Sequence, residues 1–115
     1  MIDIQKFEDE LDDLPTKMRD QRLVVIEKQK IVDEAKLKFN VANGMAIVAA
    51  KAPNATEKKA IAINLTKDEA MAIIEADYNL KKEEAGLTYL EDRFITARKI
   101  LSIEQELIKS NLRGN

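Results

Sequence analysis

The chain has 115 residues and a formal net charge of −2, with 35% charged and only 4% aromatic residues. It contains neither cysteine nor histidine, which excludes disulfides, thiolate metal sites and the usual general base of enzymes. Three glycines and two prolines among many helix-forming residues predict a single all-helical domain, residues 1–115, with a thin aliphatic core.

Residues 1–14 are predicted to form a short N-terminal helix. Its apolar residues recur at the spacing of one helical face: Ile4, Phe7, Leu11 and Leu14. Six acidic residues against one lysine make this helix strongly acidic. Pro15 is expected to end it or to begin the next helix. These residues contain no basic segment followed by an apolar run, so we expect a cytoplasmic location without a secretory signal.

Residues 16–52 are predicted to form a long helix, because only Gly44 departs from the helical pattern. Apolar residues recur in it at every seventh position: Val25, Val32, Phe39 and Ala46. Pro53 then disfavours helical structure at the residue before it. Residues 53–66 are predicted to be a connection that contains a short helix, at about 57–63.

The sequence Asn-x-Thr occurs twice within residues 53–66. Because we expect no secretion, we interpret these sequences as helix caps and not as glycosylation sites. Asn54 and Thr56 are alternative caps for the short helix. Thr66 and Glu69 fit a capping box, in which each side chain bonds the other residue's backbone N–H at the start of a helix.

Residues 67–111 are predicted to form a second long helix with a coiled-coil pattern. Six apolar residues follow one another at every seventh position: Ile73, Leu80, Leu87, Phe94, Leu101 and Ile108. The two long helices are expected to pair as an antiparallel, coiled-coil-like hairpin. The N-terminal helix would fold back onto this hairpin or onto a neighbouring chain.

The apolar residues outside these seams cannot all face one partner helix, so we expect homo-oligomers. A folded-back three-helix monomer is the alternative.

Basic residues are expected to gather at two places in such a hairpin. The start of the first long helix, with Lys17 and Arg19, would lie beside the end of the second, forming a basic end. A smaller basic group would lie at the hairpin tip. These charges fit either solvated faces with salt bridges or a phosphate-binding surface. The acidic N-terminal helix would bind a basic partner, compete within the chain for a basic site, or serve only solubility.

Catalytic motifs are absent from the sequence. Ser102 and Ser110 have no base in a nucleophile motif, and the glycines are isolated. The carboxylates of Asp77, Glu84 and Glu91 recur at sevens on one helix, but a dimetal helical site would also need histidine. We therefore expect no enzyme, no metal and no cofactor.

Three stretches occur in a particular order: "VANGMAIVAAKAP", "NATEKKAIA" and "IIEADYNLKKEEAGLTYLEDRFITARKIL". From about Ala35 to Ile108, this order resembles the short recombination-mediator proteins of bacteriophages, the UvsY-like family. The resemblance implies a non-catalytic homo-oligomer without cofactor that binds single-stranded DNA. Such a protein helps a RecA-like recombinase displace single-strand-binding protein during DNA recombination. The DNA-binding residues that the resemblance implies are Lys51, Lys58, Lys59, Arg93, Arg98 and Lys99.

The slightly acidic net charge departs from what DNA binding favours, unless assembly concentrates the basic residues. Two other functions therefore stay open. One is a structural or chaperone-like helical assembly protein. The other is a small inhibitor or antitoxin whose acidic arm imitates nucleic acid.

Overall fold

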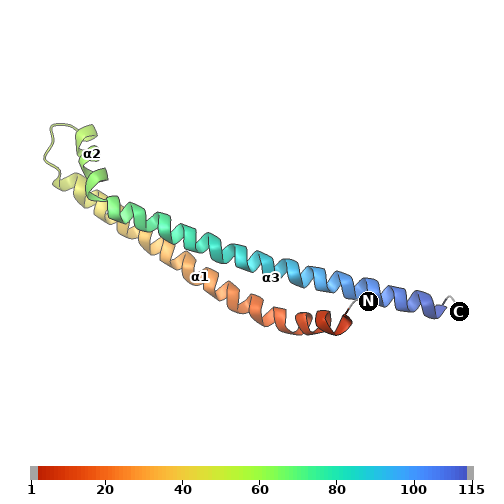
Figure 1. Ribbon diagram of the computed structural model, residues 1–115. Helices are drawn as coiled ribbons and strands as arrows, with labels where there is room; N and C mark the ends of the chain where they lie inside the picture. Colours follow the sequence, from red (N-terminus) through yellow and green to blue (C-terminus); the bar gives the residue numbers. More distant parts are fainter. Residues whose placement is uncertain (1–2, 114–115) are drawn as a thin grey trace. The chain divides into compact units, whose positions relative to one another are not determined.

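The computed structural model describes residues 3–113, and within them the chain forms three helices and no strand (Figure 1). These are α1 (Ile4–Ala49), α2 (Ala55–Leu65) and α3 (Lys67–Arg113). The long helices α1 and α3 run antiparallel and pack against each other, which confirms the predicted all-α hairpin. Tertiary contacts divide the chain into two units, which we describe separately. Unit 1 comprises residues 1–23 and 84–115, and unit 2 comprises residues 24–83.

The predicted break at Pro15 is wrong, because α1 continues through this proline without interruption. Proline cannot donate a hydrogen bond to the carbonyl of Leu11, four residues earlier, and its ring crowds that carbonyl. The helix continues because apolar residues on both sides of the proline are buried on one face. Leu14 and Met18, one turn apart, are both buried in unit 1. The acidic segment is therefore the first part of α1 and not a separate helix.

The connection at the tip follows the sequence prediction closely. Helix α1 ends at Ala49, slightly before the predicted end, and α2 is two residues longer at each end than expected. The Oδ1 atom of Asn54 accepts a hydrogen bond of 2.9 Å from the backbone N–H of Glu57. Asn54 has extended backbone angles, as a helix N-cap requires. Of the two alternative caps, Asn54 is the one that forms.

The capping box predicted at Thr66 and Glu69 does not form in the described residues. The Thr66 hydroxyl donates to the carbonyl of Ala62 at 2.7 Å, and so closes α2 instead of opening α3. Its backbone angles, φ −109° and ψ 18°, are not the extended angles of an N-cap. Thr66 is the single residue between the two helices, and its own carbonyl accepts the N–H of Ala70. One residue thus ends α2 and begins the hydrogen bonding of α3.

The core of unit 2 is small and aliphatic. Val32 of α1 packs with Ala76 and Leu80 of α3, and Val25 covers this cluster. Val32 is almost completely buried. Val32 is one of the heptad residues of α1, and the small side chain of Ala76 on α3 leaves room for it between the two helices. The core is thin because each helix offers only one narrow apolar stripe to the other.

Unit 1 has a second small core, in which Ala97 and Leu101 of α3 are buried. Gly86 of α3 lies beside Gln21 of α1, and a Cβ atom at Gly86 would be 3.2 Å from the Gln21 side-chain nitrogen. The ion pair between Glu10 and Arg93 joins the same two helices. These contacts fix an antiparallel register in which the acidic start of α1 packs on its own chain.

The predicted seam of α3 faces inward over most of its length. Leu80 and Leu101 are buried, and the three other members from Ile73 to Phe94 are half-buried. Ile108 is an exception, with 50% of its surface exposed. In unit 1, Glu10 of α1 meets Arg93 of α3. Helix α1 begins only six residues before Glu10, whereas Ile108 lies fifteen residues after Arg93, so α1 does not extend as far as Ile108.

Candidate nucleic-acid interface

The six predicted phosphate-binding residues lie in two different units. Lys51, Lys58 and Lys59 belong to unit 2, around the start of α2. Arg93, Arg98 and Lys99 belong to unit 1, on α3. We therefore describe the exposure and the charged neighbours of each group separately.

The first group is the more electropositive. Between residues 44 and 67 the chain has four lysines and one carboxylate, that of Glu57, and the carboxylates of Asp68 and Glu69 follow directly after the last lysine. We call the four lysines the tip cluster: Lys51, Lys58, Lys59 and Lys67. Three of them are exposed, and Lys58 is half-buried. Within residues 3–113, none of the four takes part in an ion pair. The tip cluster is thus free to bind anions.

Helix α2 holds two of these lysines in place on a short, well-anchored element. Its N-terminus is capped by Asn54, and its C-terminus is closed by the Thr66 hydroxyl. Ala62 is completely buried and attaches α2 to the rest of unit 2. Lys58 and Lys59 follow one turn after the cap, so their positions depend on that cap.

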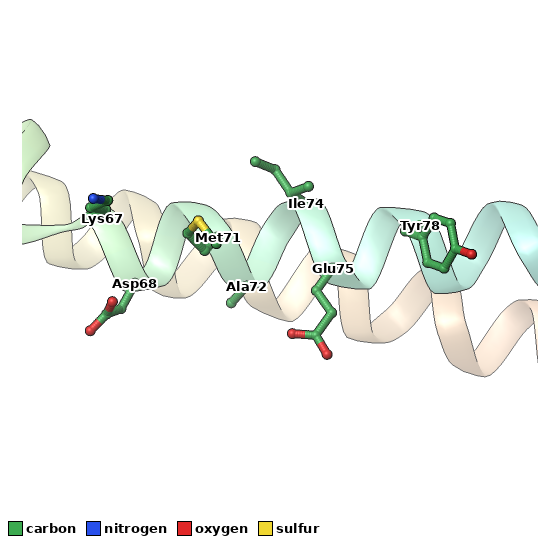
Figure 2. Close-up of a pocket in the computed structure, with 7 residues that line it drawn as sticks. All are labelled: Lys67, Asp68, Met71, Ala72, Ile74, Glu75 and Tyr78. Carbon is green, nitrogen blue, oxygen red and sulfur yellow. The ribbon is translucent and has the colours of Figure 1, made fainter.

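Lys67 was not among the residues predicted to bind DNA, and it continues the tip cluster onto α3. Figure 2 shows it with Met71, Ile74 and Tyr78, which follow at helical spacing along α3 and line a shallow hollow of about 570 Å³. Asp68, Ala72 and Glu75 project from the opposite edge of this hollow. Tyr78 is 68% exposed. The signal in the sequence was the spacing of Lys67 and Tyr78, eleven residues or about three turns apart.

The second group is largely neutralised by neighbouring carboxylates. Arg93 pairs with Glu10, and both side chains are more than half-buried. Arg98 and Lys99 are exposed, and the Arg98 guanidinium lies 5.8 Å from the centre of the Phe94 ring. Between residues 91 and 109 there are four basic and four acidic residues. The electrostatic attraction for phosphate is therefore weaker here than at the tip cluster.

The predicted basic end of the hairpin is also wrong. It assumed that a helix starting after Pro15 would place Lys17 and Arg19 beside the last turns of α3. Because α1 begins at Ile4 instead, the residue that meets Arg93 is the acidic Glu10. Within the described residues, Glu10 of the acidic segment pairs with Arg93 of its own chain.

Unit 2 also has an apolar groove between α1 and the start of α3, with a volume of about 830 Å³. Its floor includes four large side chains of α1 that are between 40% and 68% exposed: Ile31, Leu37, Val41 and Met45. Charged residues border it, including Glu34, Lys38 and Glu69. One carboxylate oxygen of Glu69 is buried and has no hydrogen-bond partner among the described residues. This groove was not predicted, although its residues recur at helical spacing.

Residues 3–113 contain no group of three or more acidic side chains placed to hold a metal ion. None of the helices in the same range combines the length and the apolar character needed to cross a membrane. Comparison with protein-family models, curated proteins and solved structures found no match to this chain.

Proposed function

We propose that the protein is a non-catalytic, homo-oligomeric recombination mediator that binds single-stranded DNA through the tip cluster. The observation that carries the proposal is the group of four lysines on and beside α2, none of which takes part in an ion pair within residues 3–113. The order of sequence features that resembles phage mediators supports the same function. The binding partners would be single-stranded DNA, a RecA-like recombinase and a single-strand-binding protein.

The chemistry of the tip cluster fits a flexible strand better than a duplex read by sequence. Lysine ammonium groups bind phosphates without reading base edges. The exposed ring of Tyr78 on the same face as Lys67 offers a surface on which a base can stack. A duplex keeps its bases stacked on each other and cannot use such a ring. We therefore expect a preference for single strands over duplexes and little dependence on sequence.

Fluorescence anisotropy with a labelled single-stranded oligonucleotide at two salt concentrations tests DNA binding. Four phosphate contacts give a salt slope of about −3, so a rise from about 50 to 200 mM salt should weaken binding roughly fiftyfold per chain. A labelled duplex should bind more weakly. If the single strand does not bind at the lower salt concentration, the proposal is wrong, and the helical assembly protein becomes the better hypothesis.

Two charge reversals locate the binding surface. K58E/K59E and R98E/K99E change the net charge by the same amount, one in each unit. We expect K58E/K59E to abolish measurable binding and R98E/K99E to change it only slightly. The opposite ranking would place the DNA on unit 1.

Mediation itself is tested by filament assembly of a RecA-like recombinase on DNA already covered by single-strand-binding protein. The wild-type protein should shorten the lag before assembly, and K58E/K59E should not. If the protein binds DNA but leaves the lag unchanged, it is a DNA-binding protein without mediator activity.

A further inference from the structure

The exposed stripe of α1 that forms the floor of the groove has a symmetry that suits a second copy of the same chain. Ile31, Glu34, Lys38 and Val41 follow each other at three- and four-residue spacing, so they share one face of α1. All four lie in unit 2 and border one groove. Ile31 and Val41 are exposed, as are both charged side chains. Within the described residues, no other helix covers this stripe.

The order of these residues is self-complementary about position 36. If a second α1 lies antiparallel across the first, with the two-fold axis beside this position, residues equally distant from it face each other. Glu34 and Lys38 are each two residues away, so each meets the other on the opposite copy. Ile31 and Val41 are each five residues away and also meet. Every contact occurs twice, as an isologous interface requires.

The residue on the axis does not obstruct this arrangement. Lys36 is two residues from both Glu34 and Lys38, which turns its side chain to the other side of the helix. Its side chain is exposed there. The Lys36 side chains of the two copies therefore point away from the interface and do not repel each other there.

We propose that this protein self-associates through the α1 stripe, with two antiparallel copies joined by two Glu34–Lys38 pairs and two Ile31–Val41 contacts. This inference rests on the self-association in the proposed function and names the surface responsible. Glu34 also lies 3.9 Å from Lys30 of its own helix, with both side chains mostly exposed. Such an exposed pair is weak, so it does not keep Glu34 from a partner.

Single charge reversals should disrupt the association, and combined reversals should restore it. E34K and K38E each replace two attractive contacts by repulsive ones, so each should weaken self-association by about tenfold or more. The double variant E34K/K38E restores opposite charges at both contacts. An equimolar mixture of the two single variants does the same between different chains. K36E, which makes the same change of charge as K38E but on the other side of α1, is the matched control.

Sedimentation velocity without nucleic acid measures the outcome, with circular dichroism to confirm that each variant stays helical. We expect the wild type, K36E, the double variant and the mixture to associate alike, and E34K and K38E to dissociate. The inference is overturned if the wild type is monomeric, if the single reversals leave association unchanged, or if the combined reversals do not restore it. In the first case the groove would serve a different protein.

The same measurements separate this inference from the DNA proposal. K58E/K59E should lose DNA binding while keeping its mass in solution, because its substitutions lie outside the stripe. A wild-type protein that self-associates but does not bind single-stranded DNA refutes the mediator function and leaves the interface in place. Normal DNA binding by a monomeric wild type refutes the interface and the homo-oligomeric state, and leaves the DNA-binding surface in place.

Discussion

Replacing Pro15 by alanine should stabilise the protein. The proline is the twelfth residue of α1, which begins at Ile4, and its side chain is exposed. It therefore contributes little packing, while it leaves the carbonyl of Leu11 without its helical donor. Alanine supplies the missing N–H and removes the clash of the ring with that carbonyl. The perturbation tests the finding that α1 is one continuous helix.

The expected gain follows from helix propensity. Proline in a helix interior is less favourable than alanine by about 3 kcal/mol. A helix can bend at proline and so recover part of this cost. We therefore expect the free energy of unfolding to rise by roughly 1–3 kcal/mol. For a chain of this size, this corresponds to an increase in Tm of at least about 4 °C.

Urea denaturation followed by circular dichroism measures this gain, at one fixed protein concentration because self-association also stabilises the chain. Thr16→Ala is the matched control, since Thr16 is the exposed neighbour of Pro15, and its change should stay below about 0.7 kcal/mol. If the chain instead broke at Pro15, alanine would add no helical hydrogen bond. A gain no larger than that of the control would therefore refute a continuous α1.

Other substitutions test the remaining parts of the fold by the same denaturation assay. Gly44→Ala should stabilise by up to about 1 kcal/mol, because no atom lies within 4 Å of the added Cβ. Gly86→Ala should gain less, since its Cβ would lie 3.2 Å from the Gln21 side chain; equal gains would contradict this contact. Leu80→Ala should cost about 3 kcal/mol by leaving a cavity in the core of unit 2. Asn54→Ala should cost about 1 kcal/mol and Asn54→Gly only a few tenths, with faster amide exchange in α2.

Helical periodicity predicted the long helices and their inward faces well, because packing acts on the same spacing that is visible in the sequence. Leu80 and Leu101 are buried as the heptads required. Local rules failed where tertiary contacts opposed them. The rule that proline breaks a helix failed at Pro15, since burial of Leu14 and Met18 on both sides outweighs one missing hydrogen bond. Because a break was expected at Pro15, the long helix was predicted to begin at residue 16 and not at Ile4. The prediction of a basic end depended on that start and was therefore also wrong.

The candidate site was predictable only in part. Lys58 and Lys59 stand out in the sequence because few acidic residues are near them along the chain. Arg93 looked equivalent, because its partner Glu10 is 83 residues away and no local pattern reveals it. The α1 stripe was overlooked for a different reason: its apolar residues are interspersed with charges, and their exposure depends on which face α3 occupies.

The connection between α2 and α3 consists of one residue, Thr66. Thr66 is buried and is hydrogen-bonded to the helix before it and to the helix after it, which restricts bending between the two helices. In the proposed function, a strand bound at Lys58 and Lys59 would act on a helix joined directly to the first turn of α3, where Asp68 and Glu69 border the groove. Helix α2 is thus joined to α3 without a loop between them.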